Sequence, residues 1–191
     1  MVTRSIIRFD FERDVRIADA MASRLKPYVY ENELYGLMPN DYPKLTLGGL
    51  LMRLHRLKAL SNLLTPKQNE LRQQAQAKHD EILRDWRVAY EGKIKREFQA
   101  RLVSLNGLLD ECNGNPERCA ENYPLLAETR VMTAALAEEA EALNIFSTDM
   151  KNGLGAVDNK MHRFTEHGSF IWDERLHSAY PDKKFWYLYV K

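Results

Sequence analysis

Histidines and acids near the C-terminus have the residue types of a metal site. His162 and His167 flank Glu166, and Glu174 and His177 form a Glu-x-x-His pair. Metalloprotease helices place two histidines at i and i+4 on one face, whereas His162 and His167 are five residues apart. Di-iron bundles need a second Glu-x-x-His pair, which this chain lacks. The spacing favours polar surface residues, and we expect no metal ion and no other cofactor.

Other catalytic signatures are absent or wrongly spaced. The chain has no Gly-x-Ser-x-Gly elbow and no Walker loop, the motifs of serine hydrolases and phosphate-binding enzymes. Gly48 and Gly49 open an expected helix, where backbone N–H groups would offer an anion site. Small residues also let helices pack closely, and we favour that interpretation. We therefore expect a non-enzymatic protein, with a ligand-binding or enzymatic helical bundle as the second alternative.

The two cysteines allow two interpretations. Cys112 and Cys119 flank an Asn-Gly-Asn-Pro turn, and a hairpin there would bring them within the roughly 4.4–6.8 Å between Cα atoms that a disulfide needs. Two cysteines alone do not complete a four-ligand zinc site. Because cytosolic thiols are normally reduced and nothing in the sequence indicates export, we favour two free thiols over a disulfide.

Charge and composition exclude several classes of protein. The 191 residues include 28 Lys and Arg against 27 Asp and Glu, a net charge of +1, so the overall charge gives no argument for nucleic acid or an acidic membrane as the main partner. The apolar fraction of 45% is too high for a disordered chain. The first 14 residues contain no long apolar run, and none elsewhere approaches the roughly 20 residues of a membrane span. We expect a cytoplasmic protein without a membrane segment.

Helices must position the residues discussed so far. Apolar spacing and capping residues predict helices at about 11–26, 47–64, 66–112, 124–143 and 148–166. The expected start signals are Asp10, Thr46, Thr65, Pro124 and Ser147. A continuous helix over 66–112 would be about 70 Å long. Gly92 lies within this range, and the sequence leaves open whether the helix continues through it.

These elements predict an all-α, antiparallel helical bundle in a single domain, 1–191, built on the long central helix 66–112. Helix 47–64 folds back on its N-terminal half, and the last two helices form a three-helix bundle with its C-terminal half, at about 93–166. The aromatic tail, 169–191, is expected to dock as an extended segment on the Tyr-rich N-terminal region at 27–45.

The length of the central helix suggests a function. Its neighbours barely span it, so its apolar stripe near Ile82, Trp86 and Tyr90 is a candidate interface, since Trp and Tyr often anchor interfaces. We therefore expect a protein–protein interaction or scaffold protein, a candidate subunit of a larger assembly or a homodimer. The opposite interpretation is that the first helix and the tail cover this stripe, leaving a monomer.

Nucleic-acid binding is the first alternative function. Basic and aromatic residues alternate in Lys183, Lys184, Trp186 and Tyr187, and again at 24–30. Aromatic stacking beside positive charge is how single-stranded nucleic acid is often held. The same aromatic residues are equally able to pack on one another in the core, which we favour.

Overall fold

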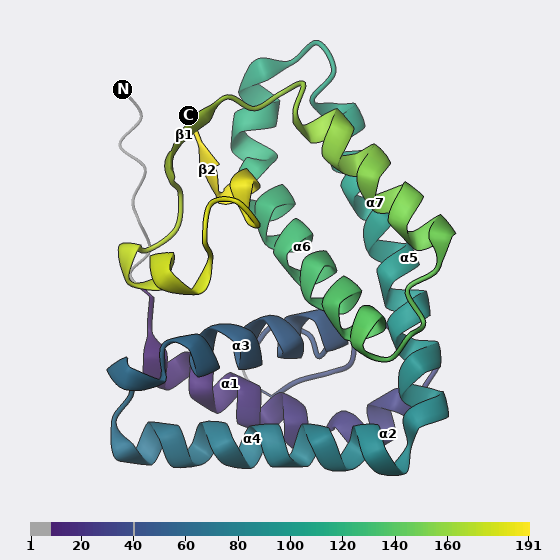
Figure 1. Ribbon diagram of the computed structural model, residues 1–191, viewed down its shortest axis with the longest axis vertical. Coiled ribbons are helices and arrows are strands. Elements are labelled where there is room, and N and C mark those ends of the chain that lie inside the picture. The colour runs from purple at the N-terminus through teal and green to yellow at the C-terminus, as the bar shows by residue number, and fades with distance from the viewer. Residues whose placement is uncertain (1–8, 40) are drawn as a thin grey trace.

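The computed structural model describes residues 9–39 and 41–191 of the chain. Its helices are α1 (Phe11–Ser23), α2 (Leu25–Tyr30), α3 (Leu47–Ala59), α4 (Pro66–Asp85), α5 (Arg87–Glu111), α6 (Pro116–Ala142) and α7 (Thr148–Met161). Short 3-10 helices η1 (Ser61–Leu63), η2 (Glu174–Ala179) and η3 (Trp186–Leu188) follow α3 and α7, with antiparallel strands β1 (His167–Phe170) and β2 (Tyr189–Val190). The predicted all-α fold class is confirmed (Figure 1).

Side chains cap the helices where the sequence places start signals. Asp10 accepts a hydrogen bond from Arg13 N, Thr46 from Gly49 N and Ser147 from Met150 N. Thr65 opens α4 with a reciprocal capping box, in which its side chain and that of Gln68 bond each other's backbone N–H. These contacts are local, so each of these four helix starts is encoded within about four residues.

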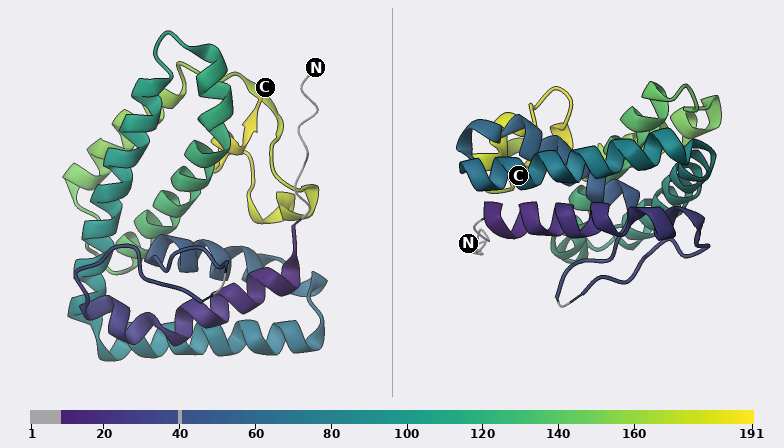
Figure 2. Two further views of the ribbon diagram at one scale, coloured as in Figure 1. Left: turned by 180° about the vertical axis from the view of Figure 1, so that it is seen from behind. Right: turned by 90° about the horizontal axis from the view of Figure 1, so that it is seen from below.

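The predicted continuous helix over 66–112 is wrong, because the chain kinks at Trp86. The backbone of Trp86 takes φ −129° and ψ 34°, which ends α4 and begins α5. Gly92, the expected weak point, lies inside α5. The kink lets α4 pack along α1 while α5 packs against α6 and α7 (Figures 1 and 2). Burial against two different sets of helices outweighs the continuity of one long helix.

Two prolines differ from their expected roles. Pro124 was expected to open the fourth helix, but α6 begins at Pro116, behind the Asn115 cap, and Pro124 lies inside it. The first helix was expected to end at Pro27, but α1 ends at Ser23 and Pro27 lies in the first turn of α2. A proline in a first turn costs no hydrogen bond, because the backbone N–H groups there have no intrahelical partner.

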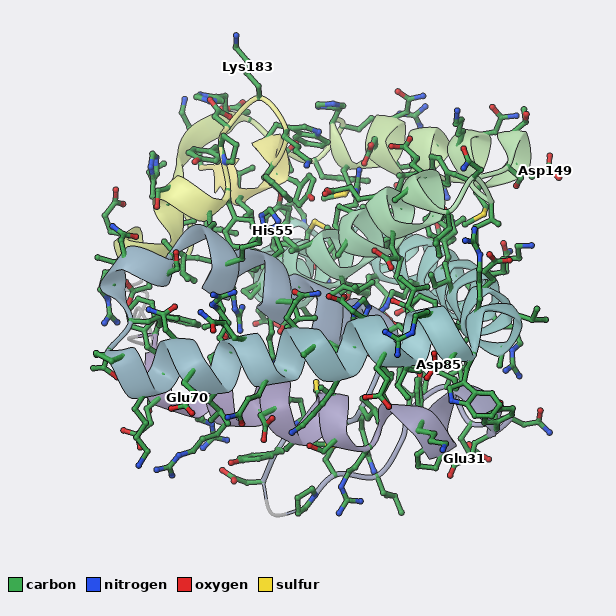
Figure 3. All side chains as sticks on the ribbon, turned by 60° about the horizontal axis from the view of Figure 1, so that its bottom comes forward. Glu31, His55, Glu70, Asp85, Asp149 and Lys183 are labelled. Carbon is green, nitrogen blue, oxygen red and sulfur yellow. A yellow bond between two sulfur atoms is a disulfide. The ribbon has the colours of Figure 1, made fainter. Side chains whose placement is uncertain are left out.

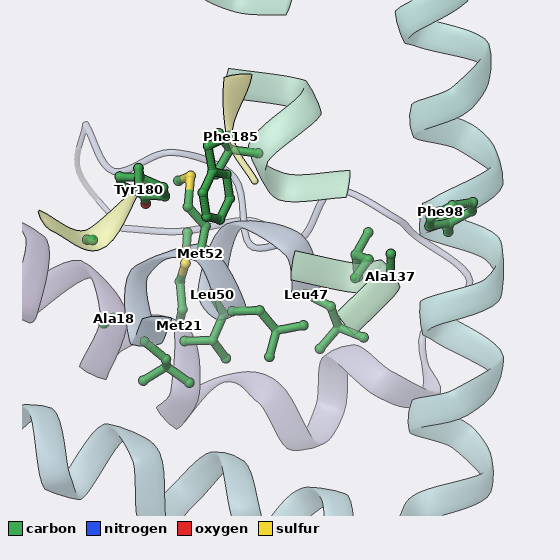
Figure 4. Close-up of a cluster of buried hydrophobic side chains, with 14 of the residues drawn as sticks. Ala18, Met21, Leu47, Leu50, Met52, Phe98, Ala137, Tyr180 and Phe185 are labelled. Carbon is green, nitrogen blue, oxygen red and sulfur yellow. The ribbon is translucent and has the colours of Figure 1, made fainter. Parts of the chain in front are cut away.

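The core lies where α1, α3, α4, α6 and the C-terminal segment meet. Met21, Leu50 and Met52 are at most 1% exposed, and Tyr180 and Phe185 from the C-terminal segment are at most 3% exposed. Figure 4 shows these side chains converging on α3. The third helix is therefore packed on both sides, as its wide apolar stripe predicts.

The C-terminal segment, 167–191, folds back, but neither as an extended strand nor on the 27–45 region as expected. It forms η2, η3 and the small sheet, and it packs on α3 through η2. The Tyr123 hydroxyl of α6 donates to Tyr187 O at 2.8 Å. The N-terminal end joins it, because Phe9 N donates to Asp173 Oδ2 at 2.7 Å.

Candidate functional site

The predicted interface of Ile82, Trp86 and Tyr90 does not form as one surface. Ile82 and Tyr90 are 7% and 0% exposed, whereas Trp86 is 37% exposed. The kink at Trp86 is the reason, since α4 and α5 each turn an apolar side onto other helices and both flanking side chains join the core. Only Trp86 of the three remains available to a partner.

Trp86 shares the surface with Tyr30 and Lys26. Its ring lies 5.2 Å from that of Tyr30 and 5.3 Å from Lys26 Nζ. Tyr30 is 54% exposed. We call Tyr30 and Trp86 the elbow surface. It lies beside Glu31 and Asp85, which are labelled in Figure 3.

The predicted nucleic-acid residues are also divided between surface and core. Lys183 and Lys184 are exposed, but Tyr187 is 1% exposed, with the Arg130 guanidinium 4.7 Å above its ring. The ring of Trp186 stacks on His162, with centroids 3.7 Å apart. The prediction that Tyr187 offers a stacking surface to bases is wrong, because its ring faces are covered within the fold.

The cysteines form a disulfide. Cys112, the last residue before the α5–α6 turn, is bonded to Cys119 in the first turn of α6, and their Cα atoms are 4.5 Å apart. The preference for two free thiols is therefore wrong. Disulfides are rare in cytosolic proteins, so this pairing counts against the cytoplasmic expectation.

The N-terminus of α3 holds an anion that the chain itself supplies. The carboxylate of Glu97, on α5, accepts from Leu47 N at 2.7 Å and from Gly48 N at 3.0 Å. Arg101, one turn along α5, donates to Glu97 Oε1 at 2.8 Å and to Thr46 Oγ1 at 2.9 Å. Gly48 also permits close packing, since a Cβ there would lie 3.0 Å from Met132 O. The backbone N–H groups of Leu47 and Gly48 are thus occupied, and the glycine serves packing.

The candidate functional site is a cavity of about 250 Å³ between α3, α4, α6 and the C-terminal segment. We call it the His–Glu cavity. One wall is apolar and aromatic, and the other carries titratable groups. Its lining residues are Leu51, Met52, Leu54, His55, Lys58, Gln76, His79, Val131, Ala135, Glu138, Glu139, Tyr180 and Phe185. Figure 3 shows His55 on α3, on the side that faces this cavity.

A chain of hydrogen bonds underlies the polar wall. His79 Nε2 lies 2.6 Å from Tyr90 Oη, and Tyr90 Oη donates to Glu139 Oε1 at 3.2 Å. His79 Nδ1 lies 3.0 Å from a carboxylate oxygen of Asp80. Burial and the Glu139 carboxylate raise the pKa of Tyr90 well above its ordinary value, so its hydroxyl keeps its proton. The buried phenol therefore connects His79 and Glu139.

Two further contacts involve residues that line the His–Glu cavity. The C-terminal segment supplies Ala179 O, which lies 2.9 Å from His55 Nε2, and this nitrogen therefore donates. Lys184 Nζ pairs with Glu138 Oε1 at 3.0 Å. This ion pair is exposed, and among the described residues no hydrogen bond occupies Glu139 Oε2, whereas Oε1 accepts from Tyr90.

Sequence reasoning missed this cavity, although it singled out Tyr90. His79, Tyr90 and Glu139 come from α4, α5 and α6. They are 11 and 49 residues apart along the chain, so no local spacing indicates that they meet. The close packing of three helices brings them together.

Neither a metal site nor a membrane-spanning helix is found in the part of the chain that the structure describes. Those residues contain no group of three or more His, Cys, Asp or Glu able to hold a metal ion. Within the same residues, no helix has both the length and the apolarity that crossing a bilayer requires. No protein-family model, no curated protein and no solved structure matches the chain.

Proposed function

We propose that the chain binds a small amphipathic amine in the His–Glu cavity. The observation that carries the proposal is the meeting of a carboxylate, Glu139, with an apolar and aromatic wall in one concave site. Small-molecule sites are typically apolar pockets with a few convergent polar groups. A volume of about 250 Å³ lies just below their usual range of roughly 300–1,000 Å³, so the ligand is small.

The charges around the cavity favour a cation. Two carboxylates, Glu138 and Glu139, oppose one lysine, Lys58, among the lining residues. An ammonium group would form a charge-assisted hydrogen bond to Glu139 Oε2. The aromatic residues Tyr180 and Phe185 line the same cavity, and aromatic faces attract cations.

Binding of benzylamine, measured by calorimetry, tests the proposal. Benzyl alcohol, which keeps the ring and loses the charge, is the matched ligand, and we expect it to bind at least about ten-fold more weakly. Glu139→Gln should weaken benzylamine binding by about ten-fold or more and leave benzyl alcohol binding unchanged. The amide still accepts the Tyr90 hydrogen bond, so the fold should be preserved.

The matched control is Glu141→Gln, an exposed residue on the same helix and outside the cavity. It should bind benzylamine as the wild type does. Equal affinity of the wild type for the amine and the alcohol would refute the proposal, as would unchanged amine binding by Glu139→Gln.

A second candidate function is binding of another protein chain, including a second copy, at the elbow surface. The observation that favours it is the exposed pair of Tyr30 and Trp86, whose ring centroids lie 5.2 Å apart. Trp and Tyr are enriched among the residues that carry most of the binding energy in interfaces. Light scattering at micromolar concentration tests self-association, and pull-down with Trp86→Ala tests other partners. Val103→Ala is the control, since Val103 is 65% exposed on α5. A monomeric wild type whose Trp86→Ala variant retains every partner would exclude this surface.

A further inference from the structure

A second cavity, of about 290 Å³, lies between α3, α5, α6 and the loop before α3. We call it the arginine pocket. Its lining residues are Tyr35, Pro43, Lys44, Thr46, Gly49, Arg53, Arg101, Ser104, Leu125, Glu128, Thr129 and Met132. Three cations and one carboxylate line it, so its charge is opposite to that of the His–Glu cavity.

Two buried arginines share one carboxylate partner, and one of the two, Arg53, lines this pocket. Arg53 and Arg56 are 7% and 8% exposed, and both lie against Asp14. Arg56 holds Asp14 through both carboxylate oxygens. The Arg53 Nε atom is 3.2 Å from Asp14 Oδ1 but makes no hydrogen bond, and its Nη1 donates to Gly49 O at 2.8 Å. Arg53 is thus a buried cation with an unused donor and only a share of one carboxylate.

The remaining charges do not supply the missing partner. Arg101 is neutralised by Glu97, with which it forms a buried ion pair of 2.7 Å. Lys44 is exposed at the pocket. The one acid among the lining residues, Glu128, forms no ion pair with Arg53 among the described residues. A ligand that brings its own negative charge would therefore meet Arg53 and Lys44, and Glu128 would be the one carboxylate among the lining residues that opposes it.

The rim of the pocket is apolar. Tyr35 and Leu125 are 52% and 54% exposed, and both line the pocket together with Met132. Free apolar area next to a buried cation suits a ligand with an anionic end and an apolar end. An inorganic anion would contact the cationic groups of the pocket and leave the apolar rim without a contact.

We propose that the arginine pocket binds a small organic anion, whose carboxylate or phosphate group contacts Arg53 and Lys44 while its apolar group packs against Leu125 and Tyr35. The backbone N–H groups at the start of α3 take no part, because Glu97 occupies them. The site is separate from the His–Glu cavity, which shares none of its lining residues.

Calorimetry with phenyl phosphate tests the proposal, with phenol and inorganic phosphate as matched probes. We expect phenyl phosphate to bind at least about ten-fold more tightly than either probe, because phenol lacks the anionic group and inorganic phosphate lacks the apolar ring. Affinity should fall as salt rises, since exposed Lys44 contributes by charge. Equal binding of phenyl phosphate and inorganic phosphate would overturn the proposed apolar contact and with it the ligand class.

Variants at the edge of the pocket leave the buried arginine side chains themselves unchanged. Lys44→Met should weaken phenyl phosphate binding about five- to ten-fold, and Glu128→Gln should strengthen it several-fold by removing the opposing charge. Lys67→Met, an exposed lysine on α4, should change nothing. Glu139→Gln should also leave this binding intact, which separates it from the amine site. Unchanged affinity in both Lys44→Met and Glu128→Gln would refute the proposal.

Discussion

Replacing Glu97 by glutamine should destabilise the fold more than any comparable change at the surface. Glu97 is 1% exposed and accepts from two backbone N–H groups at the start of α3. It also forms the buried ion pair with Arg101. An amide side chain keeps one acceptor oxygen, but it turns an NH₂ group toward other donors and leaves the Arg101 charge buried without a partner.

The magnitude follows from these contacts. Removing one partner of a buried ion pair costs about 3–5 kcal/mol. The negative charge at the N-terminus of α3 adds roughly 0.3–1 kcal/mol. A total of about 3–6 kcal/mol corresponds to a fall in Tm of roughly 6–24 °C for a chain of this length. A domain in the middle or upper part of the usual range of roughly 5–15 kcal/mol for the free energy of unfolding would remain folded at room temperature.

Thermal and urea unfolding, followed by circular dichroism, measure this loss. Glu111→Gln is the matched control, because Glu111 is an exposed residue of the same helix that pairs with Arg118 at 3.2 Å. Surface pairs contribute about 0–1 kcal/mol, so its Tm should scarcely move. Adding Arg101→Met to Glu97→Gln removes the unpaired charge and should restore part of the stability. A loss below about 1 kcal/mol for Glu97→Gln would refute the reasoning.

Three other outcomes follow from the packing, the buried phenols and the disulfide. Gly48→Ala should lower the free energy of unfolding by about 1–3 kcal/mol, because the added Cβ would press on Glu97 and Met132. Gly107→Ala is the control: nothing lies within 4 Å of the added Cβ, so this change should stabilise α5 by about 0.5–1 kcal/mol. Burial raises the pKa of Tyr180 to about 12. The contribution of this group to stability should therefore be complete below about pH 10 and fall as the pH rises from about 10 toward 12. Phenolate absorbance at about pH 11 should be lower in native than in denatured protein, and equal absorbance would contradict the burial. Denatured, unreduced protein should show no reactive thiol at Cys112 or Cys119, and two free thiols would contradict the disulfide.

Local signals were sufficient for the secondary structure at most helix starts. Asp10, Thr46, Thr65 and Ser147 all cap helices as predicted, because a cap uses a side chain and a backbone N–H only two or three residues apart. The same reasoning was wrong at Pro124, which lies inside α6. There the packing of α6 against α3 and α5 offsets the hydrogen bond that proline removes.

The candidate sites were much less predictable. The sequence pointed to Tyr90 as an interface residue, yet its ring is buried and its hydroxyl links His79 to Glu139. It pointed to Gly48 as a packing residue, which holds, but nothing in the local pattern indicated that Glu97 would fill the anion position at the start of α3. Both contacts join residues about 50 positions apart, beyond the reach of helical periodicity.

The sequence by itself determined the all-α class and where most helices begin, since apolar spacing and capping depend on near neighbours. Only the tertiary structure decided that the chain turns at Trp86, that α3 lies between α1 and α6, and that the C-terminal segment closes over α3. The physical reason is that apolar burial is non-directional. One amphipathic pattern is compatible with several partners, and the arrangement that buries α3 on both sides also brings the polar residues of distant helices together.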